Sequence, residues 1–246
     1  MATAPRDLDR PAFYALRSGG WRDLVTILHP PYTAWHLSYV ALGAAAAPVL
    51  HAGRLGAALG AFFLAVGVSA HALDELAGRP LRTALTDRAL LALALIGLVG
   101  AVAIGVAGIV VVSPLLIPFV AVGAFLVLAY NLELAGGRFH TDTWFALAWG
   151  AFPAFTGYFV NALEIRPAGV LVAAACFLLS VAQRRLSTPV RELRRSTIDV
   201  SGEQHLADGR VVELDRTRLA APLESALSAL WLALVLLAAG LVAVRL

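Results

Sequence analysis

The sequence predicts an all-α polytopic membrane protein with about seven transmembrane helices and a cavity that faces the cytoplasm. Of its 246 residues, 60% are hydrophobic and 14% are charged, and the mean hydropathy is +0.80. The apolar residues form runs of the ~20 residues that a helix needs to cross the hydrocarbon layer. The short alternating segments of a transmembrane β-barrel are absent from the sequence.

Residues 1–33 precede the first apolar run. Phe13, Leu16 and Trp21 interleave here with Arg10 and Arg17. This mixture is typical of an amphipathic segment that lies in the membrane interface.

Seven apolar runs follow. The first six form a membrane core over residues 34–185, and the third and fourth are joined by a very short link at Ser113-Pro114. A seventh transmembrane helix is expected within residues 222–246. We place the spans at about 34–51, 55–76, 88–111, 114–132, 142–163, 167–185 and 222–244.

Residues 186–221 form the one sizeable polar segment, a predicted loop. Its first part, Leu186–Arg195, is basic and is expected to be helical. Residues 197–200 and 210–214 are typical of two strands, and Asp208-Gly209 is a good turn signal between them. The segment either caps the cytoplasmic mouth of the bundle or is a solvated connector.

The arginines indicate the orientation of the chain. Sixteen of the nineteen fall in the N-terminal segment and in the loops after the even-numbered spans. Since basic residues favour the cytoplasmic side, the N-terminus is expected in the cytoplasm and the C-terminus outside.

With this topology, the unusual polar residues lie at one membrane face. His71, Asp74 and Glu75 stand at i, i+3 and i+4 near the end of the second span, so they share one face of a helix. Ionisable groups at such a depth suggest a functional site. The same membrane side receives residues from the other spans: His36, Tyr130, Asn131, Glu133, Arg138, His140, Asp142 and Arg184.

Two chemistries need such a set. Asp74 and Glu75, with arginines that include Arg79, Arg138 and Arg184, could hold a diphosphate together with Mg²⁺. Alternatively, a transition metal such as Zn²⁺ or Fe²⁺ could be bound by histidines and carboxylates. The candidate metal ligands are His71, Asp74, Glu75, Glu133 and His140.

Several short motifs, in this order, resemble those of the UbiA-type intramembrane prenyltransferase superfamily. His29-Pro30-Pro31-Tyr32-Thr33 is similar to the family's entry to span one, and His71–Leu81 resembles its first aspartate motif followed by R-P-L. Tyr130-Asn131-Leu132, Arg138 and Gly150–Pro153 resemble a later stretch of the family pattern. Only Asp74 matches the first aspartate motif clearly, and the second motif has no aspartate counterpart near residues 183–192.

The resemblance implies a helical bundle around a cytoplasm-facing cavity in which Mg²⁺ holds a prenyl diphosphate. It implies catalytic roles for Asp74, Glu75 and Tyr130, and substrate contacts from Arg79, Asn131, Arg138 and Arg184. The expected partner is an isoprenoid or another membrane lipid, and not a nucleic acid. Prenyl transfer is the first hypothesis, a lipid-modifying metalloenzyme the second, and a non-catalytic lipid-binding or assembly protein the third.

Overall fold

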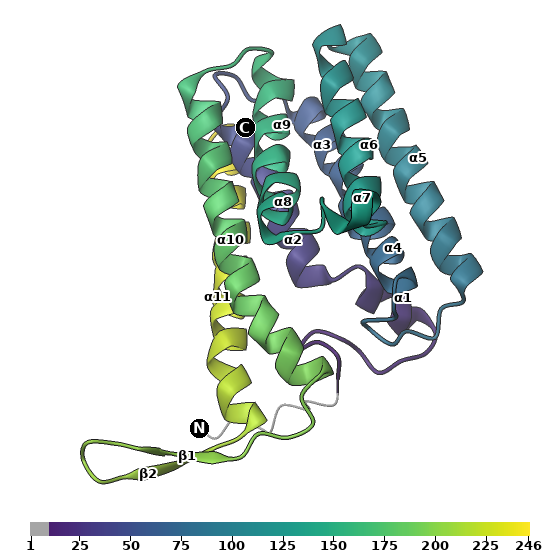
Figure 1. The fold of residues 1–246 in the computed structure, drawn as a ribbon. Coiled ribbons are helices and arrows are strands. Elements are labelled where there is room, and N and C mark those ends of the chain that lie inside the picture. The colour runs from purple at the N-terminus through teal and green to yellow at the C-terminus, as the bar shows by residue number, and fades with distance from the viewer. Residues whose placement is uncertain (1–9) are drawn as a thin grey trace.

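The computed structural model describes residues 10–246, most of which are helical (Figure 1). Within this range, five helices are long and apolar enough to cross a membrane. They are Ala52–Leu76, Asp87–Val111, Pro114–Asn131, Pro167–Arg195 and Arg216–Ala243. The predicted class, an integral multi-pass protein built from helices, is consistent with this architecture. The first nine residues of the expected interfacial segment lie outside the described part of the chain.

The N-terminal part of the described chain leads into the centre of the bundle. Helix α1 (Trp21–Ile27) is short, and α2 (Pro30–Ala46) begins at two prolines, whose missing N–H groups cost nothing in a first turn. α2 occupies the place of the expected span 34–51 and packs against both α9 and α11. The contact with α9 is close, because a Cβ atom on Gly43 or Gly157 would collide with the backbone of the other helix.

The second expected span is one continuous helical rod with a π-helical middle. It consists of α3 (Ala52–Phe62), the π-helix η1 (Phe63–Ala70) and α4 (His71–Leu76). α5 (Asp87–Val111) packs along it and connects through the 3₁₀ turn η2 (Pro114–Leu116) to α6 (Ile117–Asn131). The short link expected at Ser113-Pro114 is therefore present.

The fifth expected span also contains a π-helix. After α7 (Leu134–Gly137), the chain forms α8 (Asp142–Ala146), the π-helix η3 (Leu147–Ala151) and α9 (Phe152–Ala162). π-helical turns are rare in proteins, and many of those that occur lie at functional sites.

The last two long helices form an antiparallel pair linked by a hairpin. α10 (Pro167–Arg195) runs without a break past the expected boundary at residue 185, and α11 (Arg216–Ala243) returns beside it. Strands β1 (Gly202–His205) and β2 (Val211–Leu214) form the hairpin (Figure 1). The strand expected at 197–200 is wrong, because those residues form no strand and β1 begins at Gly202.

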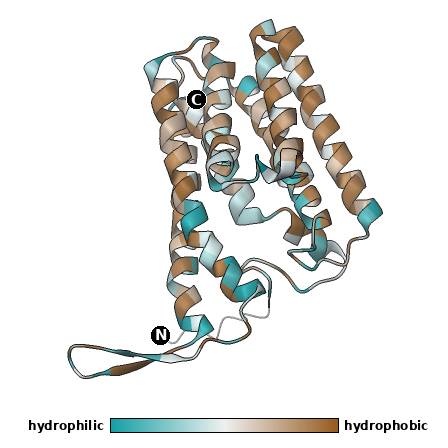
Figure 2. Ribbon diagram, in the orientation of Figure 1, coloured by the Kyte–Doolittle hydropathy of each residue, from teal (hydrophilic) through white to brown (hydrophobic). Residues whose placement is uncertain are grey.

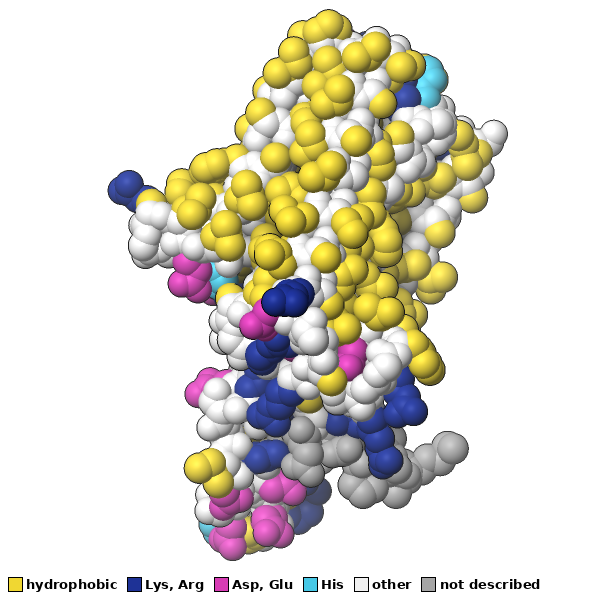
Figure 3. Space-filling view, turned by 90° about the vertical axis from the view of Figure 1, so that its right-hand side faces the viewer, with side chains coloured by type: hydrophobic (Ala, Val, Ile, Leu, Met, Phe, Trp, Pro, Cys, Tyr) yellow, Lys and Arg dark blue, Asp and Glu magenta, His cyan; other side chains and the backbone are white. Residues whose placement is uncertain are grey.

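The two ends of the bundle differ in polarity. Hydrophilic residues gather at the end that carries the hairpin, which we call the hairpin end, and apolar residues dominate the rest of the ribbon (Figure 2). A space-filling view shows arginine side chains in a band between the apolar body and the acidic hairpin region (Figure 3).

Candidate functional site

A cavity of about 310 Å³ lies near the hairpin end and is lined largely by polar side chains from α2, α4, α6, α10 and residues 11–14. We call it the polar cavity. Six of the residues that the sequence suggested for the site line it: His71, Asp74, Tyr130, Asn131, His140 and Arg184. The structure therefore brings together groups that lie up to 113 residues apart in the chain.

Glu75 does not line this cavity, although it is adjacent to Asp74 in the chain. Its carboxylate is fully buried and accepts hydrogen bonds from the Leu81 and Thr83 amides at 2.8 Å and from the Thr83 hydroxyl at 2.9 Å. These bonds hold the turn that follows α4. Glu75 is thus engaged in folding this turn and does not face the space where a ligand would bind.

Three more expected site residues point elsewhere. Arg79 pairs with Asp87 and donates to the Leu85 carbonyl, so it holds the loop before α5. Arg138 is exposed on the segment between α7 and α8. Glu133 is also exposed, and its carboxylate lies 3.9 Å from His140 Nδ1.

Three cavity histidines share one bonding pattern. His36 Nδ1 lies 2.7 Å from the Trp149 carbonyl, His140 Nδ1 lies 3.0 Å from the Tyr130 carbonyl, and His71 Nδ1 lies 3.3 Å from the Gly67 carbonyl. Because a carbonyl oxygen only accepts, Nδ1 carries the hydrogen in each ring. Two of these carbonyls, those of Gly67 and Trp149, belong to the π-helices η1 and η3.

His29 and Tyr14 form the wall of the cavity next to α4. The His29 ring stacks on His71 with 4.0 Å between centroids, and Tyr14 Oη lies 2.8 Å from His29 Nδ1. Burial, with a smaller contribution from His71, lowers the pKa of His29 well below its usual value, so the ring is neutral at pH 7. Burial likewise raises the pKa of Tyr14 well above 10, which keeps its hydroxyl protonated.

The α10 side of the cavity is basic. Arg184, Arg191 and Arg195 lie on one face of the helix at spacings of seven and four residues, and all three line the cavity. Arg184 is paired with Asp142 at 2.7 Å. Arg191 donates to Thr188 Oγ1 at 2.9 Å and Arg195 to the Pro11 carbonyl at 3.2 Å, and neither has a carboxylate partner among residues 10–246.

Sequence reasoning missed Arg191 and Arg195 as site residues. The predicted membrane core ends at residue 185, so both arginines fall in the predicted loop. The signal was the helical spacing to Arg184, which becomes visible once residues 186–195 are read as a continuation of the same helix.

A second, apolar pocket of about 150 Å³ lies between α3, α5, α6 and the α8–α9 segment. We call it the apolar pocket. Val66 of η1 and Trp149 of η3 line both this pocket and the polar cavity. We call these two residues the neck. The Trp149 indole also packs edge-on against Tyr130, with 5.7 Å between ring centroids.

Among residues 10–246, no three His, Cys, Asp or Glu side chains are grouped so that they could hold a metal ion. The ligand set expected from the sequence is therefore not assembled in this conformation. No protein-family description, no curated protein and no solved structure matches the chain. The resemblance to the UbiA-type superfamily stays a prediction.

Proposed function

We propose that this protein is an integral membrane protein that binds an isoprenoid diphosphate and transfers its prenyl group. The hairpin end would face the cytoplasm, and α2 and the α8–η3–α9 segment would cross the membrane with the five long apolar helices. One observation carries the proposal: a basic polar cavity and an apolar pocket lie on either side of the neck residues, Val66 and Trp149, which line both. An amphiphile with an anionic head and an apolar tail matches both compartments.

The head would bind at the arginines of α10. Guanidinium groups match phosphate oxygens in geometry and charge, and Arg191 and Arg195 are free to make such contacts. Asp74, on the opposite wall, offsets part of their charge.

The tail would pass the neck into the apolar pocket. Burying apolar surface contributes about 25 cal/mol per Å², so even one isoprene unit adds to affinity. The tail then lies among residues of α3, α5 and α6, which also form part of the lipid-facing surface.

The reacting carbon would lie between the two compartments. Ionisation breaks the C–O bond, the electron pair leaves with the diphosphate, and an acceptor then bonds to the allylic carbon and loses a proton. Tyr130 and Trp149 both line the polar cavity, and an aromatic ring can stabilise a cation by up to ~2 kcal/mol when water is excluded. The arginines would stabilise the departing diphosphate.

The residues present do not fit the magnesium clusters that the family resemblance implies. Within residues 10–246, Asp74 is the single carboxylate that lines the cavity, and arginines stand on α10 where the second aspartate motif is expected.

The test is diphosphate release by the purified full-length protein in lipid nanodiscs, supplied with radiolabelled farnesyl diphosphate and a membrane-lipid extract. We expect release above a protein-free control and a loss of at least tenfold in Arg191→Ala. If farnesyl diphosphate binds without release, the protein is a lipid-binding protein and not a transferase. If it does not bind, the proposal fails entirely.

Val66→Phe tests the neck. The larger side chain should obstruct the passage and weaken binding of farnesyl diphosphate about tenfold, which corresponds to ~1.4 kcal/mol, while binding of inorganic pyrophosphate should persist. Val68→Phe is the matched control, since Val68 lies in the same π-helix but lines neither compartment. Equal effects of the two variants would contradict a neck at Val66.

The histidine pattern favours a second candidate, a metal-dependent lipid-modifying enzyme. Metal-binding histidines usually donate their other ring nitrogen to a carbonyl or carboxylate, as His36, His71 and His140 do. Elemental analysis of the purified protein decides: stoichiometric Zn or Fe that is lost in His71→Ala supports this candidate, and its absence from protein purified without chelator counts against it.

A further inference from the structure

The charges of the polar cavity do not balance without a ligand. Two of its four arginines are paired, Arg184 with Asp142 and Arg194 with Glu224 at 2.5 Å. Arg191 and Arg195 remain, and among residues 10–246 Asp74 is the one carboxylate that lines the cavity. Two unpaired guanidinium groups facing one carboxylate leave the described part of the cavity with an excess of positive charge.

Two buried polar atoms of the cavity lining have no hydrogen-bond partner among residues 10–246. One is Oε1 of Gln183, which lies next to Arg184 on α10 and is 3% exposed. The other is Nε2 of His29, in the wall next to α4. Buried polar groups are usually hydrogen-bonded, so these atoms indicate that the cavity is built to contact a polar ligand.

We propose that the polar cavity binds a phosphate or diphosphate group directly through Arg191 and Arg195, without a divalent cation. This deepens the proposed function, on which it rests, by assigning the role of the family's metal to guanidinium groups. Each guanidinium group can donate two parallel hydrogen bonds to phosphate oxygens, and its positive charge is present before the ligand binds.

A cation would be disfavoured in the empty cavity. Mg²⁺ is usually held by one or two carboxylates together with phosphate oxygens. Here it would have Asp74 alone and would be repelled by two unpaired guanidinium groups. Anion binding through arginine meets neither obstacle.

The experiment measures binding of pyrophosphate and of farnesyl diphosphate to the full-length protein in nanodiscs, each with EDTA and with Mg²⁺. We expect binding in EDTA within threefold of that in Mg²⁺. Binding that requires Mg²⁺ would overturn this inference and leave the proposed function standing. Absence of binding in both conditions would overturn both.

The two ligands also separate the two sources of the anion. Tighter binding of farnesyl diphosphate supports a lipid head group as the ligand. Equal affinity for pyrophosphate would support the direct anion site but contradict the lipid function.

Asp74→Asn should change the pyrophosphate affinity in opposite directions for direct binding by arginine and for binding through Mg²⁺. Removal of the carboxylate should leave pyrophosphate affinity unchanged or raise it, since it removes a charge that repels the anion. If Asp74 held a bridging Mg²⁺, the same change would abolish binding.

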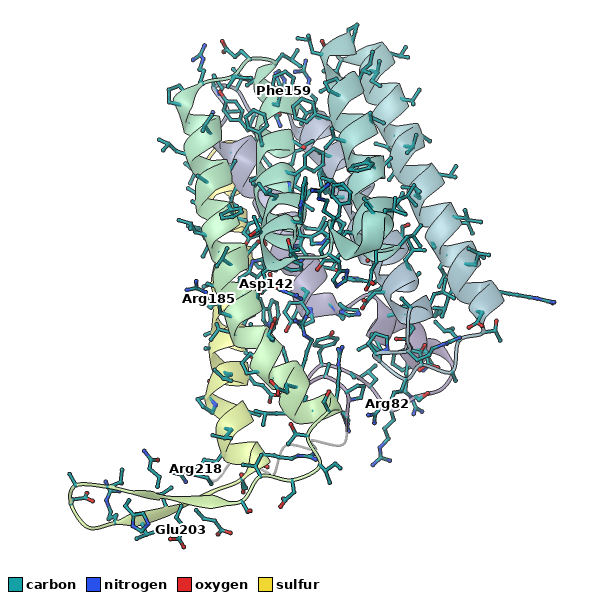
Figure 4. The ribbon with its side chains drawn as sticks, in the orientation of Figure 1. Arg82, Asp142, Phe159, Arg185, Glu203 and Arg218 are labelled. Carbon is teal, nitrogen blue, oxygen red and sulfur yellow. The ribbon has the colours of Figure 1, made fainter. Side chains whose placement is uncertain are left out.

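Arginine variants complete the test. Arg191→Ala and Arg195→Ala should each weaken pyrophosphate binding at least tenfold, and Arg191→Lys should retain part of it, because lysine keeps the charge and loses the fork. Arg185→Ala is the matched control, since Arg185 is exposed on the outer side of α10 and does not line the cavity (Figure 4). A loss in Arg185→Ala equal to that in Arg191→Ala would contradict the assignment.

Discussion

At the end of the bundle away from the hairpin, Asn161 and Arg54 connect backbone segments. Asn161 accepts from the His51 amide at 2.8 Å and donates to the Gly157 carbonyl at 2.9 Å, and Arg54 donates to the Val160 and Asn161 carbonyls. At the hairpin end, Arg191 and Arg195 keep donors unused beside an open cavity. The difference shows that polar residues at helix ends must be sorted by their partners before a function is assigned.

The largest expected effect separates two neighbouring carboxylates at the hairpin end. Glu75→Ala removes three buried hydrogen bonds and leaves the Leu81 and Thr83 amides without an acceptor. It should therefore destabilise the fold by about 3 kcal/mol or more. Asp74→Ala should leave stability nearly unchanged. Thermal unfolding in detergent, followed by circular dichroism, measures both; similar losses would contradict the division into a structural and a cavity carboxylate.

The two asparagines at opposite ends provide the next comparison. Asn161→Ala should cost about 1–2 kcal/mol, because the His51 amide loses its partner. Asn131 donates to the Val127 carbonyl of its own helix and borders the cavity, so Asn131→Ala should cost less than about 0.5 kcal/mol. Unfolding of the two variants under identical conditions checks the order, and a reversed order would refute the contrast between the ends.

The smallest effect concerns His29 and pH. Burial lowers the pKa of His29 in the folded protein, and in the unfolded chain the ring titrates near 6.5. Below that pH the unfolded chain therefore binds more protons, so the ring's contribution to stability is present at pH 7 and declines as the pH falls. The His29 ring contacts Tyr14 and His71. The positive charges of Arg191 and Arg195 also lower the pKa of His29.

The measurement is the Tm at pH 7 and pH 5 for the parent and for His29→Asn. Asparagine tolerates the left-handed backbone at this position (φ 44°) and does not titrate. The parent should lose more stability than the variant between these pH values. An equal loss would show that other groups account for the acid sensitivity.

The sequence predicted much of this architecture. The apolar runs located the five long helices, because a helix that crosses a membrane needs about 20 predominantly apolar residues in a row. It also predicted that His71, Asp74, Tyr130, Asn131, His140 and Arg184 would gather at one end, since loop charges fix which span ends meet.

The hydrogen-bond and ion-pair partners of individual side chains could not be predicted from the sequence. Glu75 and Asp74 share a helix face by spacing, yet the turn at Leu81–Thr83 folds back on Glu75 alone. Arg79 was engaged by Asp87 in the same way. The π-helices η1 and η3 also shift the register, so the contacts of Val66 and Trp149 with both compartments could not be derived from a 3.6-residue period.

The length of α10 has a consequence for how a ligand would reach the cavity. Its 29 residues span roughly 43 Å, well over the ~30 Å of hydrocarbon, so if α10 enters the hydrocarbon at its first turn, its last turns would lie at the level of the lipid head groups. A ligand held there can keep its head among those of its neighbours and arrive by lateral diffusion within one leaflet. Its occupancy is then governed by its mole fraction in the bilayer, and dilution of the vesicles in buffer leaves that occupancy unchanged.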